Sequence, residues 1–155
     1  MNIEVSSVEE TQKIAEKLGQ LVEPNMILLL DGDLGAGKTT FAKGLAVGLG
    51  ITRNVKSPTF PIVREYREGR LPLFHMDVYR LEGMGGADLG LDEYFNSDGV
   101  SVVEWSEFIQ DELPDDSLRI TLLKDEDDDN RRVIKLDSYG SQYTRILEQL
   151  VKKNG

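Results

Sequence analysis

One stretch, LLLDGDLGAGKTT at residues 28–40, constrains the fold of this chain more than any other. Residues 32–39 fit the pattern G-x-x-x-x-G-K-[ST], which is the phosphate-binding loop (P-loop) of nucleotide-binding proteins. The apolar run before it, residues 26–30, is typical of a strand that is buried on both faces. Residues 39–49 have the pattern of a helix. The sequence therefore predicts a strand, a glycine-rich loop and a helix in succession, an arrangement that binds phosphate.

Each residue type in this loop has a chemical reason. A Cβ atom at Gly35 or Gly37 would keep backbone N–H groups from turning toward a phosphate. Lys38 supplies a positive charge for the terminal phosphates and Thr39 a hydroxyl for Mg²⁺, while the N-terminus of the helix adds a favourable dipole. The residues that we expect to contact the nucleotide here are Asp33, Leu34, Gly35, Ala36, Gly37, Lys38, Thr39 and Thr40.

Two acidic residues end predicted strands further along the chain. Asp77 lies near the end of the β-rich run 71–78, and Glu104 closes the buried strand 100–103. A P-loop enzyme uses such a carboxylate to hold hydrated Mg²⁺ beside the threonine. One acid could orient the water shell of the metal while the other polarises an attacking water, and the spacing leaves the assignment open. We predict that Lys38, Asp77 and Glu104 are catalytic and that Thr39, Asp77 and Glu104 are the metal ligands.

Two hydroxyl-bearing positions outside the P-loop are further candidates for nucleotide contact. The loop 54–60 follows the P-loop helix, where many nucleotide switches place a hydroxyl against the γ-phosphate, so Thr59 or Ser57 could sense that group. On spacing alone, an ordinary turn is the commoner interpretation. Thr11, or its neighbour Gln12, could contact the base, although an amphipathic helix that packs on the sheet explains the same residues.

Three other side chains have both a structural and a functional interpretation. His75 is the only histidine, so we expect a hydrogen-bonded structural residue and not a metal ligand. Arg80 could neutralise charge in the transition state, but an ion pair is the commoner role. Trp105 is the lone tryptophan and could belong to the core, or to the edge of the site because it follows Glu104.

Composition limits the remaining alternatives. A chain of 155 residues suits a single domain, and the absence of cysteine excludes disulfides and thiolate metal sites. No apolar run approaches the 18 residues of a membrane span, and the N-terminus lacks the features of a signal peptide, so we expect a cytoplasmic protein. The net charge of −10 argues against unaided binding to nucleic acid, so a role near RNA would need a basic partner.

The rest of the chain alternates helices and strands and then becomes rich in hairpins, which predicts an α/β fold whose mixed sheet has a parallel core and antiparallel additions. A capping box at residues 7–10 opens the first helix, and Pro24 ends it. We place its apolar face at Val8, Thr11, Ile14, Ala15, Leu18 and Val22, and that of the last helix, which begins near Ser141, at Tyr143, Ile146, Leu147, Leu150 and Val151. The other predicted elements are an edge strand at 2–5, hairpins at 61–66 with 71–78 and at 118–124 with 131–137, and helices at 91–95 and 105–113.

Four segments taken together resemble the TsaE (YjeE) family of bacterial ATPases: GDLGAGKTT at 32–40, SPTF at 57–60, HMDVYR at 75–80 and EW at 104–105. The likeness runs through roughly residues 5 to 115. It implies a three-layer P-loop NTPase-like fold with ATP or ADP and Mg²⁺ as cofactors. It also implies a role in the threonylcarbamoylation (t6A) of adenosine 37 in tRNAs that read codons beginning with A.

The same resemblance implies partners and residue roles. The partners would be TsaD, which carries the transferase site, and TsaB, the scaffold, so that tRNA is reached only through the complex and neither DNA nor membrane is involved. Lys38 and Thr39 would bind phosphate and Mg²⁺, with Asp77 as the Walker-B-like acid and Glu104 as a second acid beside the metal. Residues 57–60 would form the switch and Trp105 the nearby aromatic. The chain departs from the family at Pro61, where a hydroxyl residue is common, and in the glycine-rich run 83–86.

These interpretations predict a weak ATPase that its partners stimulate and that switches the TsaD–TsaB complex. A small-molecule kinase is one alternative, but it would need an acceptor pocket and an arginine-bearing lid, and no such segment stands out. A nucleotide-binding module that does not hydrolyse is another, and the presence of Asp77 and Glu104 argues against it. A guanine-reading N-K-x-D motif is absent, so ATP is preferred mainly through the family likeness.

Overall fold

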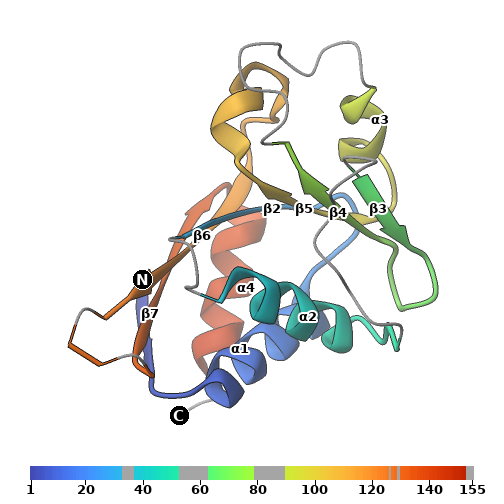
Figure 1. Ribbon diagram of the computed structural model, residues 1–155. Coiled ribbons are helices and arrows are strands. Elements are labelled where there is room, and N and C mark those ends of the chain that lie inside the picture. Colours follow the sequence, from blue (N-terminus) through green and yellow to red (C-terminus); the bar gives the residue numbers. More distant parts are fainter. Residues whose placement is uncertain (33–36, 53–62, 79–89, 126, 129, 153–155) are drawn as a thin grey trace.

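A seven-stranded sheet with the order β1-β7-β6-β2-β5-β4-β3 forms the centre of the computed structural model (Figure 1). The structure describes residues 1–32, 37–52, 63–78, 90–125, 127–128 and 130–152. The strands are β1 (Asn2–Val5), β2 (Ile27–Gly32), β3 (Val63–Tyr66), β4 (Leu73–Asp77), β5 (Val100–Glu104), β6 (Ser117–Lys124) and β7 (Arg132–Tyr139).

The sheet is parallel at its centre and antiparallel at both sides. Strand β2 pairs in parallel with β5 and β6, and β4 pairs in parallel with β5. Strands β3, β7 and β1 add to this centre in antiparallel fashion, through the hairpins β3–β4 and β6–β7 and the edge pair β1–β7. The predicted mixed sheet, both hairpins and the edge strand at residues 2–5 are therefore confirmed.

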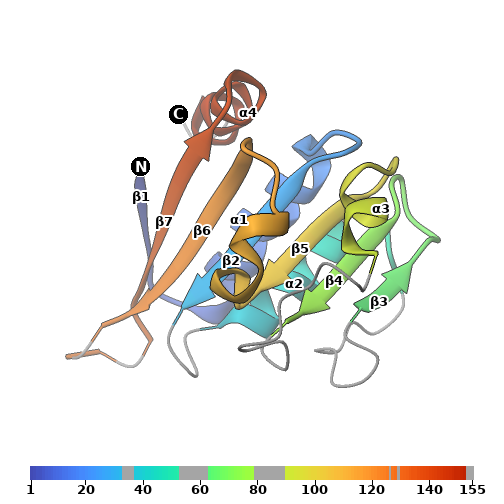
Figure 2. The ribbon, with the colours of Figure 1, turned by 90° about the horizontal axis from the view of Figure 1, so that it is seen from above.

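Helices cover both faces of this sheet, which gives three layers (Figures 1 and 2). Helices α1 (Val8–Leu21), α2 (Lys38–Gly48) and α4 (Ser141–Lys152) lie on one face, and α3 (Leu91–Phe95) and the 3₁₀ helix η3 (Ser106–Glu112) lie on the other. Strand β2 shows why its sequence is an uninterrupted apolar run. Leu28 and Leu30 join the core beneath α1, α2 and α4, whereas Ile27 and Leu29 join the core beneath α3 and η3.

Close contact between α1 and α2 depends on glycine. A Cβ atom added at Gly44 would lie 2.7 Å from the carbonyl oxygen of Gln12 and 2.8 Å from the Cβ of Ala15, and one at Gly48 would overlap the carbonyl of Glu16. The glycines that weaken α2 as an isolated helix thus let its backbone approach α1, as the sequence predicts. This contact holds the P-loop helix against the helix that precedes β2.

The end of α2 is a Schellman motif, in which a glycine takes a left-handed conformation after the last helical turn. Gly50 has φ +85°, and its N–H donates to the carbonyl of Val47 at 2.9 Å. The N–H of Ile51 donates to the carbonyl of Ala46 at 2.9 Å. The prediction of Gly50 as the residue that closes this helix is confirmed.

The start of α1 departs slightly from the predicted capping box. Ser7 is the N-cap, and its Oγ accepts a hydrogen bond from the backbone N–H of Glu10 at 3.1 Å. The Glu10 carboxylate accepts in turn from the N–H of Ser6 at 2.6 Å, one residue before the group that a capping box uses. Two backbone donors, one ahead of the helix and one in its first turn, are satisfied all the same.

Three expectations about helices are corrected. Val8 and Val151, which were placed on apolar faces, are 63% and 44% exposed. Periodicity identifies the apolar side of a helix, but it does not show how far along the helix the neighbouring elements extend. The helix predicted at residues 105–113 is the 3₁₀ segment 106–112, interrupted at Ile109 by non-helical backbone angles.

Candidate functional site

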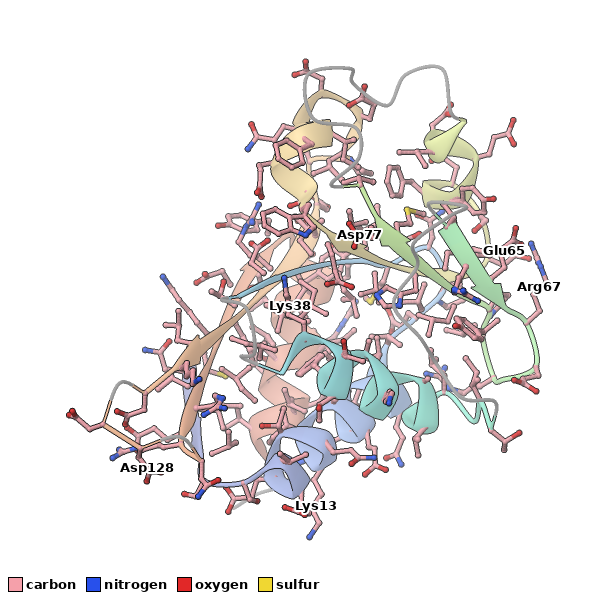
Figure 3. The ribbon with its side chains drawn as sticks, viewed as in Figure 1. Lys13, Lys38, Glu65, Arg67, Asp77 and Asp128 are labelled. Atoms are coloured by element: carbon pink, nitrogen blue, oxygen red, sulfur yellow. The ribbon has the colours of Figure 1, made fainter. Side chains whose placement is uncertain are left out.

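The carboxyl ends of β2, β5 and β4 meet at one edge of the sheet because the three strands are parallel. Leu30 pairs with Glu104, and Glu104 pairs with Asp77, so the two predicted acids are direct neighbours on adjacent strands. Helix α2 begins at Lys38 close to the same edge, and Figure 3 shows Lys38 and Asp77 in this region. The structure thus brings together three of the predicted residues that lie far apart in sequence.

The N-terminus of α2 carries the other described P-loop residues. Gly37 is its N-cap with φ +107°, a conformation that side-chain-bearing residues rarely adopt. An added Cβ would meet nothing within 4 Å among the described atoms, so backbone angle explains this glycine better than space does. Thr39 is exposed and Thr40 is half-buried on the first turn. Five predicted contact residues, Asp33, Leu34, Gly35, Ala36 and Thr59, lie outside the described residues, as do Ser57 and Arg80.

Lys38 lies between an acid and an aromatic ring. Its Nζ is 3.9 Å from Oε1 of Glu104 and 5.0 Å from the centre of the Trp105 ring. Glu104 is only 5% exposed, and a buried carboxylate is costly unless it is paired. The ammonium of Lys38 therefore offsets part of the cost of burying this carboxylate at the end of β5.

The second partner of Glu104 is His75. Its Nε2 lies 2.6 Å from Oε2 of Glu104, and the histidine is 1% exposed. The prediction of a hydrogen-bonded histidine is confirmed, but the sequence did not predict that its partner would be a site acid. A signal was present, because His75 and Asp77 are two residues apart on one strand and so share a face of the sheet.

Trp105 lies at the edge of the site, so the alternative that placed it in the core is wrong. It is 36% exposed and has φ +63°, an unusual conformation for a residue with a large side chain. Its ring stacks on Phe108 at 6.1 Å between centres with an interplanar angle of 13°. The turn from β5 into η3 thereby presents the ring to Lys38.

A cavity of about 150 Å³ adjoins this lysine. It includes two acids that sequence reasoning missed, Asp31 at the end of β2 and Glu107 on η3. Asp31 forms an ion pair with Arg119 on the neighbouring strand β6. The signal for Asp31 was its place directly between the apolar strand and the P-loop motif. The cavity is lined by Leu30, Asp31, Gly32, Lys38, Trp105 and Glu107.

Thr11 makes its hydrogen bond within helix α1 and not with the residues around Lys38. It is 4% exposed on α1, and its hydroxyl donates to the carbonyl of Ser7 at 3.4 Å within the same helix. This burial favours the packing role over contact with a base.

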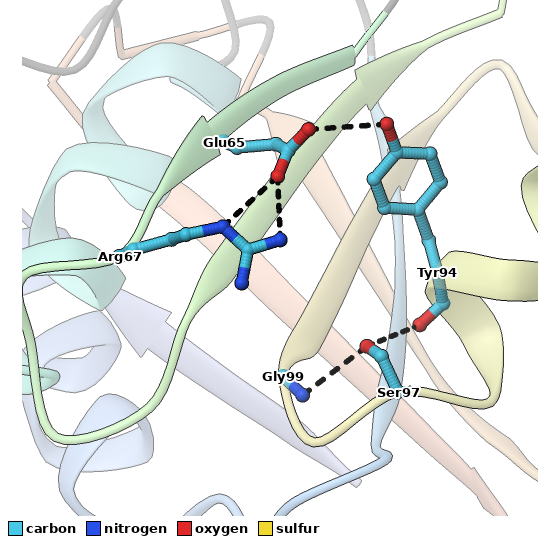
Figure 4. Close-up of polar contacts among 5 residues, drawn as sticks. All are labelled: Glu65, Arg67, Tyr94, Ser97 and Gly99. Carbon is cyan, nitrogen blue, oxygen red and sulfur yellow. Dashed lines mark hydrogen bonds and ion pairs between the residues drawn. The ribbon is translucent and has the colours of Figure 1, made fainter.

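A separate polar network ties α3 to the edge strand β3 (Figure 4). Nε and Nη2 of Arg67 donate to Oε1 of Glu65 at 3.1 and 2.7 Å, and the hydroxyl of Tyr94 donates to Oε2 at 3.2 Å. Burial, together with the nearby carboxylate of Glu65, raises the pKa of Tyr94 above 10.0. These bonds hold α3 in place and add nothing to the site around Lys38.

The donor set fits magnesium that arrives with a nucleotide. Within the described ranges, no three histidine or acidic side chains converge to hold a metal by themselves. Mg²⁺ is typically bound by one or two carboxylates together with phosphate oxygens and water. Asp77 and Glu104, on adjacent strand ends beside Lys38, supply carboxylates of that kind.

Comparison with known proteins places this site in context. Residues 5–134 match the family described as threonylcarbamoyl adenosine biosynthesis protein TsaE. The chain is 51% identical over 142 residues to the tRNA threonylcarbamoyladenosine biosynthesis protein TsaE of Bacillus subtilis, covering 92% of this chain and 88% of that protein. It is 44% identical over 117 residues to the protein of the same name from Treponema pallidum, covering 75% and 86%.

A solved structure agrees with the sequence relatives. The crystal structure of Bacillus subtilis YdiB superposes with a TM-score of 0.86 at 42% identity, covering 100% of this chain and 96% of that one. Among the described helices, none is both long and apolar enough to cross a bilayer.

Proposed function

Since the chain belongs to the TsaE family, we propose that it is a Mg²⁺-dependent ATPase that acts in the threonylcarbamoylation of adenosine 37 in tRNAs that read codons beginning with A. The observation that carries the proposal is the approach of Lys38 to Glu104, 3.9 Å apart, at the strand edge where α2 begins. A cation, a helix N-terminus and two carboxylates at one edge suit a phosphate chain with its metal.

Different residues of the chain have different roles in the proposed hydrolysis. The first N–H groups of α2 and the ammonium of Lys38 hold the terminal phosphates and spread their charge. The hydroxyl of Thr39 and the carboxylates of Asp77 and Glu104 would hold Mg²⁺, which when bound would supply positive charge against that of the phosphates. One of the two acids orients the attacking water.

The proposal extends to regulation by partners. A complex of TsaD and TsaB senses whether ATP has been hydrolysed, so the chain acts as a switch and takes no part in threonine or carbamoyl chemistry. With a net charge of −10, the chain reaches tRNA through that complex and not alone. Weak turnover in isolation follows, because the partners complete the site.

Hydrolysis by purified protein tests the enzymatic part. We expect Glu104→Gln and Asp77→Asn each to lower kcat for ATP by about 100-fold or more, because each removes a charged group that general base or metal catalysis requires. The control is Asp98→Asn. Asp98 is an exposed acid just before β5, at the end of that strand opposite to Glu104, so this variant should keep wild-type turnover. Full activity in both site variants would contradict the proposal.

Two other outcomes identify the alternatives. Transfer of the γ-phosphate to a metabolite instead of water would indicate a kinase, and binding without turnover would indicate a regulatory module. The partner-dependent part is tested by retention of TsaB and TsaD on the immobilised chain with and without ATP. If TsaB and TsaD were retained equally with and without ATP, and if they did not change the rate of ATP hydrolysis, the switch would be excluded.

A further inference from the structure

The buried imidazole of His75 contacts the acid that the proposed hydrolysis requires. His75 pairs with Val102 in the β4–β5 register, and Glu104 is the next residue of β5 on the same face of the sheet. We propose that His75 is a positioning residue, which fixes the Glu104 carboxylate so that only Oε1 faces Lys38 and the phosphate site. This inference rests on the proposed function for its consequence, but not for its geometry.

The chemistry of the pair assigns the proton. A charged carboxylate only accepts hydrogen bonds, so at 2.6 Å the Nε2 of His75 is the donor to Oε2. The other ring nitrogen, Nδ1, is buried and finds no hydrogen-bond partner among the described residues. A bare lone pair on Nδ1 costs less than an orphaned N–H would, so the geometry favours the tautomer that carries its proton on Nε2.

The ring is held on a rigid support. His75 is 1% exposed on β4, which has β3 on one side and β5 on the other, and Arg64 of β3 lies opposite it in the register. A short, charge-assisted bond from such a ring prevents the carboxylate from rotating. One oxygen is thereby committed to the protein interior, and the other is directed to the site.

The distance to Lys38 shows what this restraint achieves. Oε1 of Glu104 lies 3.9 Å from Nζ, which is longer than the 2.7–2.9 Å of a close ammonium–carboxylate hydrogen bond. If Oε2 were released, the carboxylate could turn both oxygens toward Lys38 and compete with phosphate for its charge. His75 keeps the two opposite charges near each other without closing the contact, so that both remain available to the nucleotide and its metal.

Kinetics of two variants separate this role from mere packing. We expect His75→Leu, which removes the donor but suits the apolar surroundings, to lower kcat/KM for ATP by about 10–100-fold, the usual loss when the support of a site ligand is removed. His75→Gln places an amide N–H near the position of Nε2 and should recover much of that loss. Equal losses in the two variants would overturn the proposal. So would full activity of His75→Leu, measured beside a wild type that hydrolyses ATP.

Nuclear magnetic resonance tests the geometry without any nucleotide. His75 is the only histidine, so all imidazole signals of the ¹⁵N-labelled chain come from one ring. We expect a slowly exchanging Nε2–H in the wild type and in Asp77→Asn, and its loss in Glu104→Ala. A rapidly exchanging ring, or a proton on Nδ1, would overturn the proposal whether or not the chain hydrolyses ATP. A protected signal in a chain that neither binds nor hydrolyses ATP would instead leave the geometry standing and refute the proposed function.

Discussion

Lys38 shows at the scale of single residues how charge is arranged at the candidate site. Its charge is shared between Oε1 of Glu104 at 3.9 Å and the Trp105 ring at 5.0 Å. A cation–π contact contributes about 0.5–2 kcal/mol, depending on how far it is desolvated. Neither contact is a close hydrogen bond, so a doubly charged phosphate would bind the ammonium more strongly than its present neighbours do.

We predict that Lys38→Gln weakens binding of ATP by about 10–100-fold. A charge-assisted hydrogen bond contributes about 1.5–3 kcal/mol, and each 1.4 kcal/mol corresponds to a factor of ten. Isothermal titration calorimetry measures the affinity, and the lone tryptophan beside Lys38 provides an independent fluorescence signal. Lys43→Gln, at an exposed lysine on the same helix, should bind as the wild type does. Equal affinity of Lys38→Gln and wild type would show that this lysine does not hold phosphate.

The contact between α1 and α2 determines, at the scale of elements, where the P-loop helix lies. The two helices approach so closely that glycine is required where they touch, because the backbone of α1 occupies the space that a side chain on α2 would need. The same residues are poor helix formers, so local propensity and tertiary packing oppose each other here. Packing prevails, and α2 starts at the sheet edge that carries the two acids.

Gly44→Ala tests this opposition through the sign of its effect. In an exposed helix the change would stabilise by about 1 kcal/mol. Here the added Cβ would lie 2.7 Å from the carbonyl oxygen of Gln12, so we expect a loss of about 1–3 kcal/mol in the free energy of unfolding. Urea denaturation measures both this variant and the control Val47→Ala, at a half-exposed position of the same helix, which should change stability by less than about 0.5 kcal/mol. A more stable Gly44→Ala variant would show that α1 can move aside.

The whole molecule is held together across its sequence by a sheet with a core on each face. The last helix, α4, belongs to the same core as α1 and α2 and packs beside α1 and β7. One buried bond joins it to the first parallel strand. The hydroxyl of Tyr143 accepts a hydrogen bond from the backbone N–H of Ile27 at 2.8 Å. The C-terminal helix thus satisfies a backbone donor at the start of β2, the strand that leads into the P-loop.

Burial of the Tyr143 hydroxyl makes stability depend on pH in alkaline solution. Burial raises the pKa of Tyr143 above 10.0, so the folded protein keeps a proton that the unfolded chain loses. The contribution is complete below about pH 10, the unfolded value, and is lost as the pH rises through the folded value. We expect Tyr143→Phe to lower the free energy of unfolding by about 1–2 kcal/mol at pH 7, because it leaves the Ile27 N–H without its acceptor. Above about pH 10, the stability of this variant should decrease less steeply with pH than that of the wild type.

Urea denaturation between about pH 7 and 11 measures both effects. Tyr139→Phe, at a tyrosine that is 49% exposed, should follow the wild type. If stability decreased with pH as steeply in Tyr143→Phe as in the wild type, the alkaline dependence would come from another group. Tyr94 would then be the next residue to test, because burial raises its pKa as well.

By itself the sequence determined the features that depend on local pattern. The P-loop motif and the apolar run before it predicted a strand at 26–30 and a helix at 39–49, where β2 and α2 lie, and hairpin spacing predicted the antiparallel additions. The acids at the ends of two apolar runs were identified in the same way, because a strand end is a local property. Only the tertiary structure decided that His75 bonds Glu104, that Asp31 pairs with Arg119, that Trp105 lies against Lys38 and that Val8 is exposed. The reason is physical. The first three depend on which strands become neighbours and in what register, and long-range pairing between strands leaves no mark in the local sequence. The exposure of Val8 depends on how far the elements packed against α1 extend along that helix.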